Sequence, residues 1–82
     1  MENEAMRAYR ERRAVYEAAF WRHVEAGVIF ESPDGILIDD TVRIAPGAVI
    51  LPGTILRGTT SVGAGCVIGP NSLLENVTVG ED

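Results

Sequence analysis

This sequence is poor in several residue types that support chemistry or crosslinks in other proteins. It has a single cysteine, so no disulfide bond can form within the chain. That composition fits a reduced, cytoplasmic setting. The chain has no lysine, so its seven basic residues are all arginines, and its only histidine is His23. A fold held together by disulfide bonds is therefore excluded.

The chain also lacks long hydrophobic runs and an excess of positive charge. No apolar run approaches the roughly 20 residues that a membrane-spanning helix needs. The first residues are charged, which argues against a secretory signal peptide. Twelve acidic residues outnumber seven basic ones, and the net charge of -5 argues against a nucleic-acid-binding protein. We therefore expect a cytoplasmic domain whose partners are neither membranes nor nucleic acids.

What the sequence does have is a six-residue repeat from Ile38 to Leu73. A fixed period of six is typical of a parallel β-helix. The first position of each hexad is aliphatic: Ile38, Ile44, Ile50, Leu56, Val62 and Ile68. The fifth position is small or compact: Val42, Ala48, Thr54, Thr60, Cys66 and Ser72. We expect both positions to point inward and to fill one narrow core.

The third and fourth positions of most hexads form turn pairs. These pairs are Pro46-Gly47, Pro52-Gly53, Ala64-Gly65 and Pro70-Asn71. Proline presets φ for the first central residue of a type II turn, and Gly or Asn tolerates the positive φ of the second. Each hexad is therefore predicted to be a short extended run that ends at a corner.

Three hexads make one triangular coil, so residues eighteen apart should stack at the interstrand spacing of about 4.8 Å. Sixth-position side chains should point outward. Val49 then stacks with Val67, and Ile55 stacks with Leu73. Exposed apolar stripes usually mark partner surfaces, so these four residues are candidates for an oligomer interface.

Residues 1–27 are predicted to form an amphipathic helix, because they are rich in helix formers and contain no proline. Gly27 stands where a C-cap glycine belongs. An apolar stripe follows the helical period: Met6, Tyr9, Tyr16, Phe20 and Val24. We expect the stripe to pack on the β part or on a second subunit, which makes Tyr16 and Phe20 further interface candidates. Packing on a membrane surface is the weaker alternative, because acidic residues are interleaved.

The predicted fold is mainly β: an N-terminal helix, a connection over residues 28–37, and an incomplete β-helix over residues 38–82 with about two to two and a half coils. After Leu74 the register slips, because Val79 begins a new hexad only five residues later. A β-helix with so few coils leaves strand edges unpaired. We therefore expect another segment or chain to complete it.

No residue is predicted to be catalytic, cofactor-binding or metal-binding. His23 lacks a carboxylate at a suitable spacing for a general base, and Cys66 takes an inward fifth position. The Asp39-Asp40 pair has no third ligand nearby, so solvated corner residues are expected. Arg43 and Arg57 could meet an anionic ligand, but solvent exposure is the simpler expectation.

The hexads resemble those of the hexapeptide-repeat acyltransferases, whose β-helix is left-handed. The run from Arg22 to Val28, then Pro33-Asp34 and Ile38-Asp39, resembles one family among them. This family is the bacterial bifunctional N-acetylglucosamine-1-phosphate uridylyltransferase/glucosamine-1-phosphate acetyltransferases. Residues 66–72 and 75–80 continue the likeness.

This resemblance implies a homotrimer and a role in making UDP-N-acetylglucosamine for the cell envelope. For the full-length family it also implies acetyl-CoA, Mg²⁺ and a sugar-phosphate substrate. The segments that carry those sites in the family have no counterpart in these 82 residues. This leaves two hypotheses. The chain is the opening part of such a transferase domain and is inactive alone, or it is a stand-alone trimerising assembly module without enzymatic activity.

Overall fold

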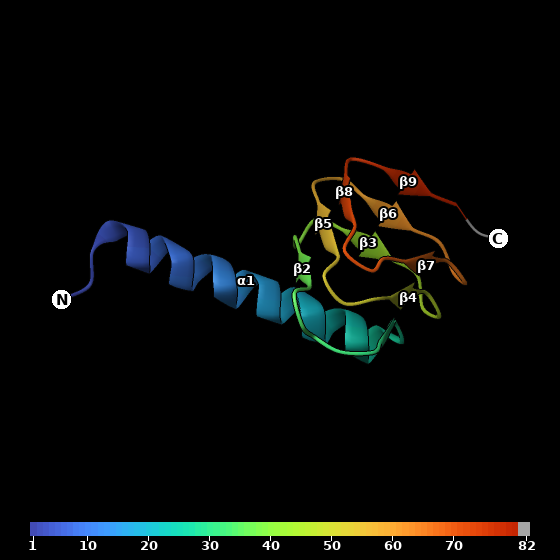
Figure 1. The fold of residues 1–82 in the computed structure, drawn as a ribbon, viewed down its shortest axis with the longest axis horizontal. Helices are drawn as coiled ribbons and strands as arrows, with labels where there is room; N and C mark the ends of the chain where they lie inside the picture. Colours follow the sequence, from blue (N-terminus) through green and yellow to red (C-terminus); the bar gives the residue numbers. More distant parts are fainter. Residues whose placement is uncertain (81–82) are drawn as a thin grey trace.

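The computed structural model describes residues 1–80, in which a single long helix precedes a stack of nine short strands. The helix α1 spans Glu4–Ala26 (Figure 1). The strands are β1 (Ile29–Phe30), β2 (Leu37–Ile38), β3 (Arg43–Ile44), β4 (Val49–Ile50), β5 (Ile55–Arg57), β6 (Ser61–Val62), β7 (Val67–Ile68), β8 (Leu73–Glu75) and β9 (Thr78–Val79).

Both ends of α1 are capped by the residues that the sequence places there. The side-chain Oδ1 of Asn3 accepts a hydrogen bond of 2.8 Å from the backbone N–H of Met6. Gly27 adopts a left-handed conformation with φ of 102°, and its N–H donates to the carbonyl of Val24 at 3.1 Å. These bonds satisfy backbone groups that have no partner within a helix end. The predicted helix and its C-cap are confirmed.

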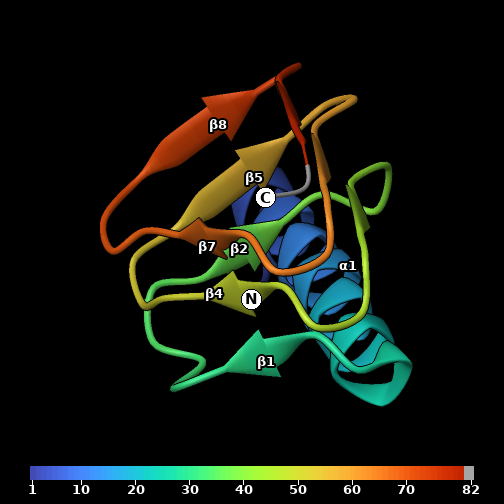
Figure 2. The ribbon, with the colours of Figure 1, turned by 90° about the vertical axis from the view of Figure 1, so that its right-hand side faces the viewer.

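The strands form three parallel sheets, one on each side of a triangular prism. Sheet A has the order β1-β4-β7, sheet B has the order β2-β5-β8, and sheet C has the order β3-β6-β9. Each strand from β1 to β6 therefore pairs with the strand three places later in the chain, as Figure 2 shows for sheets A and B. The chain folds as a short left-handed parallel β-helix after one helix, which confirms the predicted fold class.

The strand register confirms the predicted stacking. Val49 pairs with Val67, Ile55 pairs with Leu73, and both steps are eighteen residues. On sheet C the last step is one residue shorter, because Val62 pairs with Val79. The register slip that the sequence indicates after Leu74 is therefore real, and it is absorbed at the corner between β8 and β9.

The core is the narrow column that the hexads predict. The first-position side chains at the centre of the stack are sealed from solvent, with Ile50 and Leu56 both 0% exposed. Fifth-position Thr54 and Thr60 are also 0% exposed. Each threonine hydroxyl donates a hydrogen bond of 2.7 Å to the backbone carbonyl three residues earlier. Threonine is tolerated in this core because its polar atom has a partner.

The β-helix begins earlier than the repeat predicts, because residues 28–37 contribute to the first coil. Val28 is buried, and the strand that comes after it, β1, pairs with β4. Ile29 pairs with Val49, a step of twenty residues, whereas Leu37 pairs with Ile55, a step of eighteen. The corner between β1 and β2 therefore holds two extra residues. This insertion breaks the hexad period, so the period does not reveal β1 as the first strand of the coil.

Helix α1 packs most tightly on the first coil through its C-terminal half. Ala19 and His23 are its buried residues, whereas Met6 is 49% exposed and Tyr9 is 57% exposed. Figure 1 shows the N-terminal half extending beyond the β-helix. The stripe predicted from the sequence is therefore covered by the protein's own β part along one half of its length.

Candidate oligomer interface

The outer face of sheet A carries a column of aliphatic side chains, here called ladder A. It consists of Ile29, Val49 and Val67, stacked in register on β1, β4 and β7. Ile29 is 51% exposed and Val67 is 60% exposed. Neighbours along a strand point to opposite faces, so the inward position of Ile50 and Ile68 forces the residues before them outward. Ile29 extends the predicted stack of Val49 and Val67. The apolar run at residues 28–30 is the feature of the sequence that indicates this strand.

The outer face of sheet B carries a second aliphatic column, ladder B. It consists of Leu37, Ile55 and Leu73, stacked on β2, β5 and β8. Leu73 is 57% exposed, whereas Leu37 and Ile55 are half-buried. Helix α1 lies next to β2 and accounts for part of this cover. Ladder B is therefore most open at the end of the stack that lies away from α1.

Sheet C presents a polar outer face. Arg43, Ser61 and Thr78 occupy the equivalent outward positions on β3, β6 and β9. Two sides of the prism are thus apolar and one is polar. The predicted stacking on all three sides is confirmed, while the role of the two ladders as an interface stays a prediction.

The two helix residues proposed as interface candidates lie in different surroundings. The ring of Phe20 packs against the ring of Phe30 on β1, with centroids 4.6 Å apart. It also makes an edge-on contact with Trp21 at a centroid distance of 5.4 Å. Phe20 therefore joins α1 to its own first coil. Tyr16 is half-buried and lines a groove between α1 and the β-helix.

Comparison with known proteins identifies the repeat. The family described as bacterial transferase hexapeptide (six repeats) matches residues 41–76. The bifunctional protein GlmU of Caldanaerobacter subterraneus subsp. tengcongensis is 49% identical over 59 residues, which cover 72% of this chain and 13% of that protein. GlmU of Cyanothece sp. (strain PCC 7425) is 53% identical over 55 residues, covering 67% of this chain and 12% of the relative.

The chain therefore resembles GlmU over its hexapeptide repeat and the adjoining residues. It spans only about an eighth of the length of these curated relatives. The resemblance to hexapeptide-repeat acyltransferases that the sequence indicated is confirmed.

His23 lies under the hexapeptide repeat as a packing residue. Its side chain is 6% exposed, and its Nε2 atom has no hydrogen-bond partner among residues 1–80. Burial, and then the positive charge of Arg22, lower the pKa of the imidazole, while a hydrogen bond with the backbone of Val42 opposes them. No carboxylate among these residues orients the ring. This environment favours a neutral histidine that fixes α1 to the first coil.

The other titratable candidates also have structural roles in the repeat. Cys66 is buried in the core, and its thiol donates to the backbone carbonyl of Gly80. Asp39 Oδ2 accepts a hydrogen bond of 3.0 Å from the N–H of Gly58 on the next coil, whereas Asp40 is exposed. Within residues 1–80, no three His, Cys, Asp or Glu side chains group closely enough to hold a metal ion. In the same range, no helix has the length and hydropathy to span a membrane.

The two arginines considered for an anionic ligand are exposed and lie on different sides of the repeat. Arg43 is on the outer face of sheet C, and Arg57 ends β5 on sheet B. Arg57 instead lines the same groove as Arg12, Arg13 and Tyr16 of α1. Sequence reasoning missed this cluster, because its members are brought together only by the packing of α1 on the coils.

Proposed function

We propose that this chain is the N-terminal part of an acetyltransferase/uridylyltransferase-like β-helix domain of the UDP-N-acetylglucosamine pathway. Such a domain would act in the cytoplasm and serve the cell envelope. The likeness to GlmU through both the repeat and the adjoining residues supports this assignment. The full-length family would bring acetyl-CoA, Mg²⁺ and a sugar phosphate to segments other than those described here.

We further propose that this chain contributes assembly rather than catalysis, and that it assembles as a homotrimer. The observation that supports this proposal most is ladder A. Ile29 and Val67 leave an aliphatic column on the surface of a small domain, and such columns are usually covered by a partner. The triangular section of the β-helix gives each subunit two apolar faces at an angle. That shape suits a closed three-fold ring in which each subunit contacts two neighbours.

The candidates for acid–base or nucleophilic chemistry support a role without catalysis. His23 is buried without a carboxylate partner among residues 1–80, and Cys66 fills the core of the repeat. Neither side chain can reach a substrate without opening the fold. An assay with acetyl-CoA and glucosamine-1-phosphate on the purified chain should show no turnover, and turnover would overturn the proposal.

The oligomeric state is tested by light scattering with a mass determination at micromolar concentration. The chain should elute as a trimer. Val67→Glu places a charge on ladder A and should shift the mass to that of a monomer. Thr78→Glu is the matched control, because Thr78 is exposed on the polar sheet C at the same level of the stack. A wild-type chain that is monomeric under these conditions would contradict the proposed assembly.

A stand-alone trimerising module is the second candidate, and it is favoured by the same observation. Ladders A and B need no catalytic segment in order to bring three chains together. The two candidates differ in the stretch of the gene downstream of the hexads. A reading frame that continues the hexapeptide pattern beyond residue 82 would favour the transferase domain, and a stop codon there would favour the module.

A further inference from the structure

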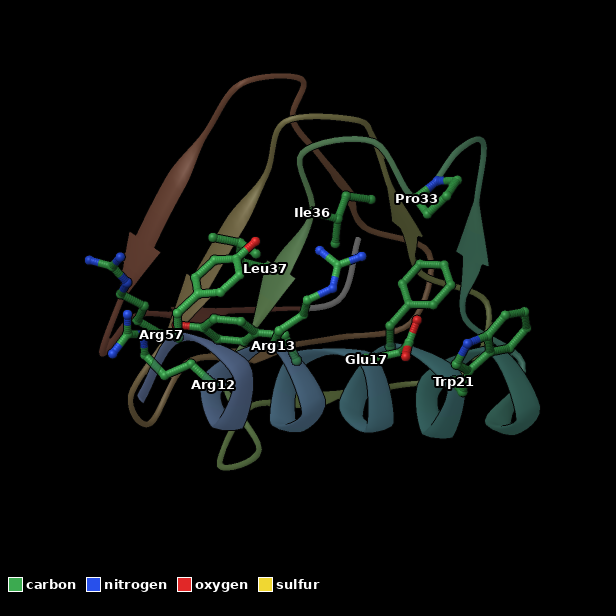
Figure 3. Close-up of a pocket in the computed structure, with 11 residues that line it drawn as sticks. Arg12, Arg13, Glu17, Trp21, Pro33, Ile36, Leu37 and Arg57 are labelled. Carbon is green, nitrogen blue, oxygen red and sulfur yellow. The ribbon is translucent and has the colours of Figure 1, made fainter. Parts of the chain in front are cut away.

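A hollow in the described surface lies between α1 and the first two coils, and we call it the arginine groove. It has a volume of about 490 Å³ and is lined by Arg12 and Arg13 from the helix and by Arg57 from β5. Tyr9 and Tyr16 line it as well. In Figure 3 the side chains of Arg12 and Arg57 lie together at one end, and Arg13 lies between them and Trp21 at the other.

The charge of this groove differs from that of the whole chain. The protein carries a net charge of -5, yet three of its seven basic residues line one hollow. Within residues 1–80, these three arginines form no ion pair. Arg7 and Arg10 pair with Glu2 instead. One carboxylate, that of Glu17, lines the groove. The groove therefore holds an excess of positive charge that the described part of the chain does not neutralise.

Guanidinium groups in this arrangement are suited to a phosphorylated ligand. Arginine presents a planar fork of N–H donors that matches a phosphate group with two parallel hydrogen bonds. Arg12 and Arg57 come from different elements and converge on the same end of the groove (Figure 3). Repulsion between these like charges is relieved when an anion lies between them. A ligand with more than one phosphate gains most, because it can reach Arg13 as well.

Apart from the carboxylate of Glu17, the rest of the groove is aromatic and apolar. Tyr9 and Tyr16 are seven residues apart, which is close to two helical turns, so they lie along the same side of α1 as the arginines. Trp21 closes the other end, opposite Arg12 and Arg57 (Figure 3). Flat side chains of this kind bind planar rings by offset stacking. The volume also lies within the roughly 300–1,000 Å³ that small-molecule sites occupy.

We propose that the arginine groove binds a small molecule that carries a polyphosphate group and a planar ring, the chemistry of a nucleoside polyphosphate. The phosphates contact Arg12 and Arg57, and the ring stacks beside Tyr9 and Tyr16. This site is formed by a single chain, so it does not depend on the proposed assembly. It would give the domain a way to respond to a phosphorylated metabolite.

Titration of the intact chain with ATP in Mg²⁺-free buffer tests the proposal. Trp21 is the only tryptophan and lines the groove, so its fluorescence reports binding directly. Calorimetry gives the affinity. ATP should bind about tenfold more tightly than tripolyphosphate, because the stacked base adds affinity that tripolyphosphate lacks. Adenosine should bind far more weakly than either. Equal affinities for ATP and tripolyphosphate, or no ATP binding, would overturn the proposal.

Variants separate the groove from general charge effects. Arg12→Gln and Arg57→Gln should each weaken ATP binding about tenfold, the usual effect of removing a charged hydrogen-bonding group. Arg43→Gln is the matched control, because Arg43 is also exposed but lies on sheet C. Tyr9→Ala should weaken ATP binding and leave tripolyphosphate binding unchanged. An equal loss of ATP binding in Arg43→Gln would refute the site, and circular dichroism verifies that each variant is folded.

Discussion

Asn71 lies directly over Gly53, one coil further along the stack, and occupies the space that a side chain at position 53 would need. A Cβ atom built on Gly53 would lie 3.3 Å from the Cα atom of Asn71 and would overlap its Oδ1 atom. Gly53 also has a φ of 80°, in the left-handed region that a side chain disfavours. The N–H of Asn71 donates to the carbonyl of Pro52 at 3.0 Å, so the two corners are held together.

Gly53→Ala should therefore destabilise the fold through both the backbone conformation and crowding. A left-handed conformation costs a residue with a side chain roughly 1–2 kcal/mol, and the displacement of Asn71 adds to this. Gly47→Ala separates the two effects, because Gly47 has a φ of 89° but no atom within 4 Å of its would-be Cβ. Urea unfolding followed by circular dichroism should rank Gly53→Ala below Gly47→Ala in stability, and the reverse order would contradict this explanation.

Leu56 at the centre of the core should be among the most costly residues to truncate. Its side chain is 0% exposed and stacks between Ile38 and Leu74 on sheet B. Leu56→Ala removes buried methyl groups and leaves a cavity in a narrow column that cannot collapse, so about 2–5 kcal/mol of stability should be lost. Met6→Ala on the projecting half of α1 is the control and should change the unfolding free energy by less than about 0.5 kcal/mol. Similar losses in both variants would show that the core lies elsewhere.

The hexad period predicted the stacked pairs because it reflects the geometry of a triangular coil directly. Each side of the prism needs the same number of residues, so Val49 meets Val67 and Ile55 meets Leu73 without further information. The strand β1 was missed because two inserted residues separate it from β2, and an irregular corner leaves no period to detect. The core residues were predictable from the same period, because fixed positions of each hexad point inward.

The hexad period could not predict how much of α1 the coils cover. It also could not predict the arginine groove. The 23 residues of α1 span about 34 Å, and its N-terminal half extends beyond the β-helix (Figure 1). An apolar stripe along the whole helix therefore cannot be covered by the coils, and Tyr9 stays exposed. Arg12 and Arg57 are far apart in the sequence, and only the position of α1 on sheet B brings them together.

Asp39 should stabilise the contact between the first and second coils. Its Oδ2 atom accepts the hydrogen bond of 3.0 Å from the backbone N–H of Gly58, at the corner after β5. Asp39→Ala leaves that donor unsatisfied in a half-buried position, which should cost about 1–3 kcal/mol. Asp40→Ala is the matched control, since Asp40 is the adjacent carboxylate and its exposed side chain makes no hydrogen bond within residues 1–80. Equal unfolding free energies for the two variants would show that the Asp39 contact adds nothing.

His23 should make stability depend on pH below neutrality. Burial lowers the pKa of its imidazole from the ordinary value of 6.5, so the unfolded chain binds a proton more readily than the folded chain does. The neutral ring therefore stabilises the fold fully above about pH 6.5, and this contribution is lost as the pH falls from there through the lower folded pKa. The urea concentration at the midpoint of unfolding should decrease as the pH is lowered from about 7.5 to about 5.5. This range brackets the ordinary histidine pKa. His23→Leu, which cannot be protonated, should flatten that fall, and an unchanged pH dependence in this variant would assign the effect to other groups.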